Sequence, residues 1–73
     1  MPTVQIEAEV SGIVCKVVAS AGQAVAFDDT IVVIESMKME IPVGAPSGGQ
    51  LVAVTVAEGD TVTEGQVIAT LET

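Results

Sequence analysis

The sequence predicts an all-β fold, a sandwich or flattened barrel of about seven or eight short strands. From Val4 to Val10, apolar and polar residues alternate with a period of two, which is typical of a strand with one side facing solvent. Short runs of Val, Ile and Ala recur along the rest of the chain, separated by Gly-, Asp- and Ser-containing segments that favour turns. No part of the chain shows helical periodicity over the roughly ten residues that would indicate a helix.

The predicted strands follow one another closely along the chain. After the alternating segment come the apolar runs, at residues 13–18, 31–35, 39–43, 51–56 and 67–71. The predicted turns lie between them, at residues 21–23, 28–29, 45–48, 58–60 and 64–66. Because Pro42 cannot donate a hydrogen bond to a sheet, we expect its strand to lie at a sheet edge or to be bulged.

The chain also contains an internal repeat. Ser11-Gly12 and Ser47-Gly48 open two similar stretches 36 residues apart, whereas later pairs are 37 apart, so one inserted residue near Gly49 aligns the halves. The aligned pairs are Gly22 and Gly59, Val17 and Val54, Val25 and Val62, Ile31 and Ile68, Ile34 and Leu71, and Glu35 and Glu72. Two copies are too few for a solenoid. We therefore expect two halves that are related by a pseudo-two-fold axis and share one core. In the turns, Asp28 aligns with Gly65, and Asp tolerates the left-handed conformation that Gly adopts freely.

One stretch breaks the usual rules for a turn. The residues ESMKME, at positions 35–40, join two strand-like runs, so Lys38 is expected at or next to the apex of a tight hairpin. Two-residue hairpin turns favour residues that tolerate positive φ, such as Gly, Asn and Asp, rather than Met and Lys. Lys38 is also one of only two basic residues in the chain, with Lys16. Because Met and Lys are unfavourable in such a turn and bring no evident structural benefit, we expect them to serve the function of the protein.

Length and charge exclude several classes of function. Seventy-three residues form one small domain, 1–73, and the net charge of −8 comes from ten acidic residues against two lysines. The chain has no arginine or histidine, so nucleic acid and anionic membranes are poor partners. The segment MPTVQIEAE lacks the features of a signal peptide, and the longest apolar runs are too short to span a bilayer. A cytoplasmic protein is therefore expected.

No constellation of catalytic residues is visible. The single Cys15 lies in the apolar run IVCKVV, is expected to be a buried thiol, and has no histidine to form a nucleophile pair. Acidic pairs such as Asp28-Asp29 lie in predicted turns, and no spacing of side chains indicates a metal site. The segment GAPSGG, at 44–49, lacks the lysine of a phosphate-binding loop. The chain by itself is therefore not expected to be an enzyme.

The motif ESMKMEIP, with Met37-Lys38-Met39 at its centre, resembles the attachment motif of biotinyl domains in biotin carboxyl carrier proteins. The resemblance extends over essentially the whole chain, including the repeat and its glycines. It implies a flattened barrel of two four-stranded antiparallel sheets, with Lys38 on an exposed turn. The halves align around residues 19–25 without an insertion, so the projecting thumb of some family members is not expected. The chain is similar to the small, free-standing type.

The resemblance also implies a cofactor, partners and roles for the hairpin residues. A biotin protein ligase would join biotin to Lys38 through an amide bond. A biotin carboxylase would then load a carboxyl group, and a carboxyltransferase would pass it to an acceptor, commonly an acyl-CoA. Met37 and Met39 would offer soft apolar surface for recognition by these enzymes. Glu35, Ser36 and Glu40 would form a polar rim, in which the two glutamates either meet basic groups of a partner or are simply polar strand ends.

Two other interpretations remain open. A lipoyl domain, as carried by 2-oxo acid dehydrogenase complexes, resembles this chain in fold and repeat and also presents a lysine on a hairpin. Such domains usually have Asp-Lys-Ala where this chain has Met37-Lys38-Met39, so biotin is favoured. An unmodified acidic β module used only for protein contacts would leave the lysine hairpin unexplained.

Overall fold

The computed structural model describes residues 2–73, which form eight strands and no helix. The strands are β1 (Thr3–Glu7), β2 (Gly12–Val17), β3 (Ala24–Val25), β4 (Thr30–Ser36), β5 (Met39–Gly44), β6 (Gly49–Val54), β7 (Thr61–Val62) and β8 (Val67–Glu72). With no helix present, residues 2–73 contain no helical segment that could cross a membrane. The predicted all-β class is confirmed.

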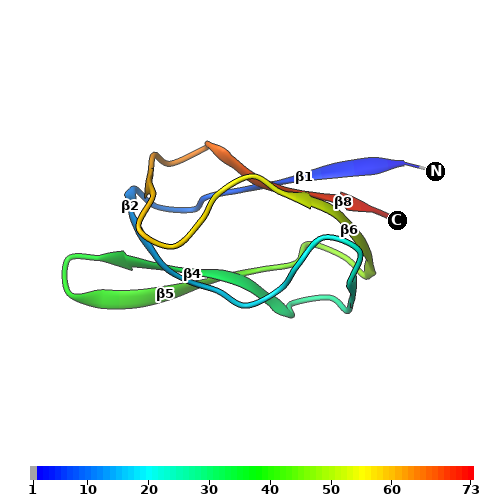
Figure 1. Ribbon diagram of the computed structural model, residues 1–73, viewed down its shortest axis with the longest axis horizontal. Coiled ribbons are helices and arrows are strands. Elements are labelled where there is room, and N and C mark those ends of the chain that lie inside the picture. The colour runs from blue at the N-terminus through cyan, green and yellow to red at the C-terminus, as the bar shows by residue number, and fades with distance from the viewer. Residues whose placement is uncertain (1) are drawn as a thin grey trace.

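The strands form two four-stranded sheets, in the orders β1-β8-β6-β3 and β5-β4-β2-β7. Every neighbouring pair is antiparallel. Figure 1 shows the sheets as two layers, with β1 and β8 in the upper one and β4 and β5 in the lower one. The predicted flattened sandwich is therefore correct. Pro42 lies in β5, an edge strand, where a missing backbone N–H is tolerated.

The core between the sheets is duplicated residue by residue. Among the described residues, sixteen apolar side chains are buried, and they form eight pairs with a constant separation of 37. These pairs are Ile6 and Val43, Ala8 and Ala45, Val14 and Leu51, Ala19 and Val56, Val25 and Val62, Ile31 and Ile68, Val32 and Ala69, and Ile34 and Leu71. The predicted pseudo-two-fold repeat is confirmed.

The predicted insertion near Gly49 is wrong. A constant separation of 37 pairs Gly12 with Gly49, whereas the matching Ser-Gly dipeptides had paired Gly12 with Gly48. The surroundings agree with the structural pairing. A Cβ atom on Gly12 would collide with the carbonyl oxygen of Glu35, and one on Gly49 would collide with that of Glu72. Glu35 and Glu72 are themselves 37 apart, so the two glycines occupy equivalent positions.

The chain ends occupy the place that the hairpin occupies in the other half. In the hairpin, Ser36 is opposite Met39. At the equivalent position the backbone N–H of Thr73 donates to the carbonyl of Pro2, at 3.0 Å. Figure 1 shows the β4–β5 hairpin at one end of the long axis of the molecule and the two termini together at the other end. The molecule measures 36 × 17 × 17 Å, so Lys38 is presented far from the points where the chain enters and leaves.

Two further sequence predictions can be compared with the structure. Asp28 has a φ of 70° and its partner Gly65 a φ of 87°, so Asp28 does adopt the left-handed conformation. Cys15 is half-buried, not buried as predicted. It lies where the register of β2 against β4 shifts between Val14 and Lys16, so its side chain does not point fully into the core.

Candidate functional site

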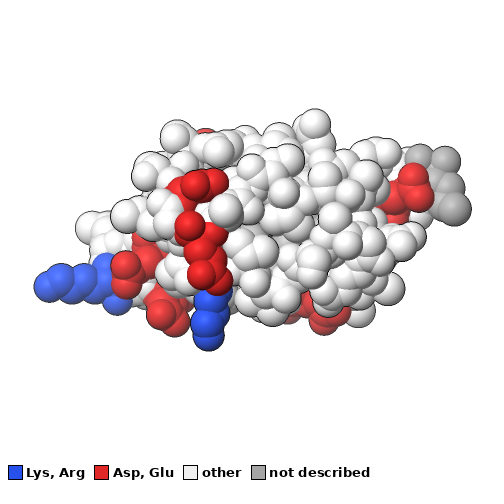
Figure 2. All heavy atoms as spheres, viewed as in Figure 1, with Lys and Arg blue, Asp and Glu red and all other residues white. Residues whose placement is uncertain are grey.

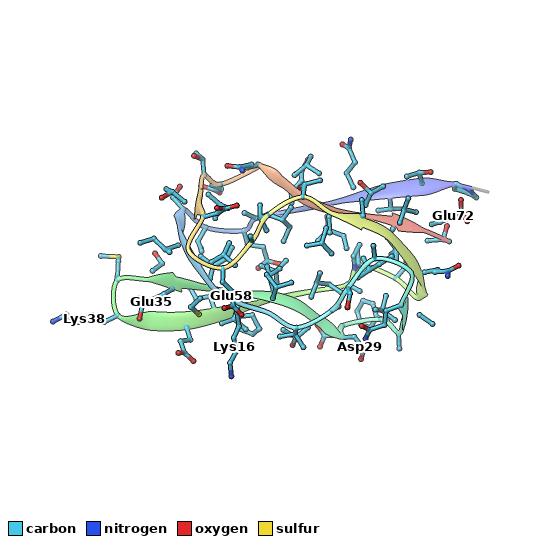
Figure 3. All side chains as sticks on the ribbon, viewed as in Figure 1. Lys16, Asp29, Glu35, Lys38, Glu58 and Glu72 are labelled. Carbon is cyan, nitrogen blue, oxygen red and sulfur yellow. The ribbon has the colours of Figure 1, made fainter. Side chains whose placement is uncertain are left out.

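The candidate site is the β4–β5 hairpin, which brings all six predicted site residues together. Strand β4 ends at Ser36 and β5 begins at Met39, so Met37 and Lys38 form the two-residue turn between them. The structure thus places Lys38 in the tight turn that the sequence predicts. Its side chain extends away from the body of the domain at the tip of the hairpin (Figure 3).

The backbone of this turn is strained by its residue types. Met37 has a φ of 53° and Lys38 a φ of 66°. Positive φ at both central residues is the signature of a type I′ turn, which matches the twist of the flanking strands. For a residue with a Cβ atom other than Asn or Asp, the left-handed conformation costs about 1–2 kcal/mol. The hairpin therefore gives up stability to hold these two side chains at its apex.

This strain leads to a prediction on stability. Met37→Asn is expected to raise the free energy of unfolding by about 1 kcal/mol, because Asn tolerates positive φ. For a domain of this size, that corresponds to an increase in Tm of about 4–8 °C. Urea titration would measure it as a higher midpoint at an unchanged m-value. Met39→Asn is the matched control: it removes the second exposed thioether from a strand residue with negative φ, and should give no gain. An equal gain in both variants would contradict the strain argument.

The methionines beside Lys38 are exposed, although methionine is usually a core residue. The Met37 side chain is 92% exposed and that of Met39 63%. Lys38 itself is exposed as well. The amine therefore stands between two flexible apolar side chains that contribute nothing to the core. Such a tip can be inserted into a site on another protein, where the thioethers would adapt to the surface they meet.

Behind the tip, the rim of the hairpin is acidic. Glu35 lies directly opposite Glu40 across β4 and β5, and both are exposed. Like charges directly opposite each other destabilise a sheet. Ser36 is half-buried and lies opposite Met39. Figure 2 shows carboxylates gathered over the part of the surface behind the projecting hairpin.

Sequence reasoning missed one neighbour of this rim. Ile13 in β2 lies opposite Glu35 on the other side of β4, and its side chain is 48% exposed. It adds apolar surface beside the two glutamates. The register between β2 and β4 is interrupted by a shift, and such a shift is not readable from the sequence.

Comparison with known proteins places the chain in a family. The biotin/lipoyl family model, described as "Biotin-requiring enzyme", matches residues 5–71. The "Biotinylated protein TB7.3 homolog" of Mycobacterium leprae is 41% identical over 66 residues, which cover 90% of this chain and 93% of that protein. The "Biotin-dependent acyl-coenzyme A carboxylase alpha3 subunit" of the same organism is 39% identical over 67 residues, covering 92% of this chain and 11% of that protein. The chain thus spans only a small part of the larger relative.

Solved structures show the same fold. The chain superposes on the urea carboxylase of Kluyveromyces lactis with a TM-score of 0.93 and 30% identity, covering 99% of this chain and 6% of that one. It also superposes on the lipoyl domain of the 2-oxoglutarate dehydrogenase complex of Azotobacter vinelandii, with a TM-score of 0.74 and 29% identity, covering 93% and 96%. The fold is therefore common to biotin- and lipoyl-bearing domains. Since the family model covers nearly the whole chain, the chain belongs to the biotin/lipoyl attachment family, and the description of that model, together with the biotinylated relative, indicates biotin as the covalently carried cofactor.

Proposed function

We propose that this domain is a biotin carboxyl carrier in which biotin is joined to the Nζ atom of Lys38 by an amide bond. The main support for the proposal is the position of Lys38. Its side chain extends into solvent from the apex of a turn whose positive φ angles favour Gly, Asn or Asp over Met and Lys. The accessible amine fits an amide linkage, and the Met37-Lys38-Met39 motif supports biotin as the attached group.

Each hairpin residue has a part in this proposal. The Lys38 amine must lose its proton before it attacks an activated carboxyl group held by the ligase, and the ligase site can accept that proton once the tip is inserted. Met37 and Met39 would pack against the ligase and later against the carboxylase. Glu35 and Glu40 would face basic groups around those sites. Held on Lys38, biotin would supply a group that can carry a carboxyl group from one enzyme to another.

In this proposal the domain holds the attached group in an accessible position and provides no side chain that makes or breaks bonds. Lys38 lies at the end of the molecule opposite the chain termini, so flanking segments of a larger assembly would leave the hairpin free (Figure 1). A carrier on a flexible tether raises the effective concentration of its group at each site it visits. We therefore propose a non-catalytic role for the chain.

The proposed partners are a biotin protein ligase, a biotin carboxylase and a carboxyltransferase. The acyl-coenzyme A carboxylase subunit of M. leprae supports an acyl-CoA as the final acceptor. The TB7.3 homologue, matched over 93% of its length, supports the small, free-standing type. A cytoplasmic location is part of the same proposal.

A lipoyl carrier is the second candidate, favoured by the superposition on the A. vinelandii lipoyl domain. One experiment separates the two. The unmodified chain is incubated with ATP and either biotin and a biotin protein ligase, or lipoate and a lipoate ligase, and intact mass is measured over time. A single biotinyl increment that forms much faster than any lipoyl increment is expected. A lipoyl increment alone would select the second candidate, and neither increment would exclude both carriers.

The acidic rim gives a further prediction with an internal control. Glu35→Gln is expected to slow loading by the ligase several-fold at low salt, because it removes a carboxylate that attracts a basic partner. The same change should stabilise the fold by about 0.2–1 kcal/mol, since it relieves the repulsion from Glu40. Glu72 is equivalent to Glu35 at the other end of the molecule but lies opposite Thr3 and Gln50. Glu72→Gln should therefore change neither the rate of loading by the ligase nor the stability of the fold. Equal loading rates for wild type and Glu35→Gln at low salt would remove Glu35 from the recognition surface.

A further inference from the structure

Within residues 2–73, the sulfur atoms are distributed unevenly between the surface and the interior of the domain. The thioethers of Met37 and Met39 lie at the tip of the hairpin, with side chains 92% and 63% exposed. The Cys15 thiol is half-buried on β2 and donates a hydrogen bond to the carbonyl of Val33, at 3.4 Å. A dissolved oxidant therefore reaches the two thioethers of the hairpin more freely than the thiol.

We propose that Met37 and Met39 are reversible oxidation sites that determine whether the ligase accepts Lys38; this inference rests on the proposed function. The oxidant is a hydroperoxide such as hydrogen peroxide. A lone pair on the methionine sulfur attacks one peroxide oxygen, the O–O bond breaks, and an S–O bond forms. The sulfur loses two electrons, and the proton on the transferred oxygen passes through solvent to the departing oxygen, which leaves as water when the oxidant is hydrogen peroxide. Methionine sulfoxide reductases reverse the step with electrons from a dithiol.

Oxidation removes the apolar character that allows these two side chains to pack against a partner. A sulfoxide is polar and chiral, whereas the thioether is flexible and apolar. Because both side chains extend into solvent, the added oxygen disturbs no core contact and the fold is retained. Packing against a partner, however, would have to strip water from the sulfoxide. The modification would therefore act on recognition and leave stability unchanged.

The two lysines make the sites separable by mass. Trypsin cleaves after Lys16 and Lys38 and yields fragments 1–16, 17–38 and 39–73, which contain Met1 with Cys15, Met37, and Met39, respectively. Graded treatment with hydrogen peroxide, before any biotin is added, should place single oxygens on fragments 17–38 and 39–73, and the rate of biotin loading should fall as these two fragments gain oxygen. A loading rate that instead follows only the oxygen on fragment 1–16, which reports Met1 and Cys15 together, would overturn the proposal.

The decisive measurement is the rate of biotin loading before and after peroxide. After removal of peroxide by catalase, loading of the oxidised chain is expected to be about tenfold slower or more, in line with the loss of a buried methionine contact. Treatment with methionine sulfoxide reductases of both stereospecificities and dithiothreitol should restore the original rate. Circular dichroism and the thermal midpoint should stay unchanged, which a general unfolding effect would not allow.

Two variants complete the design. A Met37→Leu/Met39→Leu chain should load at the same rate before and after peroxide, whatever its absolute rate. A Cys15→Ser chain should remain as sensitive as wild type. The inference is overturned if sulfoxide forms at both positions without slowing loading, or if the double leucine variant is slowed equally. An untreated wild-type chain that accepts no biotin would overturn the proposed function itself, and this outcome is recognised before any oxidant is added.

Discussion

A Lys38→Arg variant is expected to accept no biotin at all, whereas Lys16→Arg should be loaded as fast as wild type. Arginine keeps the long apolar stem and the positive charge of lysine. Its guanidinium, however, stays protonated and is no nucleophile at neutral pH. The substitution thus leaves recognition by size and charge largely in place and removes only the reacting amine. A complete loss of loading would assign Lys38 a covalent role rather than an electrostatic one.

Lys16 is a demanding control because it is the only other lysine in the chain. It is exposed, but it lies within β2, which runs between β4 and β7 in the middle of its sheet. An amine on that face stands on a broad surface and cannot be inserted into an enzyme pocket as a hairpin tip can. Intact mass after incubation with ligase, ATP and biotin would count the biotin groups on each variant. Biotin on the Lys38→Arg chain would show that accessibility alone selects the amine and would refute the hairpin as the attachment site.

Much of this fold could be predicted because its signals are local. The alternation after Val4, the β-branched runs and the turn residues each act over a few positions, and together they define the long strands. The hairpin could be located because its two flanking runs are both clear and the residues between them are unusual for a turn. The six residues of the candidate site follow from that one motif, and the structure brings all six together in β4, β5 and the turn.

The features that could not be predicted depend on pairing between distant strands. The Ser-Gly dipeptides suggested an offset of 36, but the buried side chains require 37, because they pack against each other across one core. The half-buried state of Cys15 arises from a register shift between β2 and β4. None of these contacts leaves a pattern within a single strand.

The duplicated core predicts where the fold is least tolerant of change. A Gly49→Ala variant is expected to lose about 1–3 kcal/mol of stability, a large share of the roughly 4–11 kcal/mol typical of a domain this size. The new Cβ atom would collide with the carbonyl oxygen of Glu72 and would lie 3.3 Å from Cδ1 of Leu71. The carbonyl belongs to the neighbouring strand β8, so it can move only if the ladder between β6 and β8 opens.

The neighbouring glycine provides the control, and the repeat provides a second test. A Cβ atom on Gly48 would lie 3.7 Å from the carbonyl oxygen of Val25, an ordinary contact, so Gly48→Ala should cost little. Gly12→Ala should cost about as much as Gly49→Ala, since its Cβ atom would collide with the carbonyl oxygen of Glu35 and lie 2.8 Å from Cγ2 of Ile34. Urea unfolding of the three variants would separate the two possible alignments of the repeat. If the repeat paired Gly12 with Gly48, as the dipeptides suggest, Gly48→Ala would be the destabilising change. If the core sets the pairing, Gly12→Ala and Gly49→Ala are the destabilising changes, and a variant that combines them should lose close to the sum of both losses in stability.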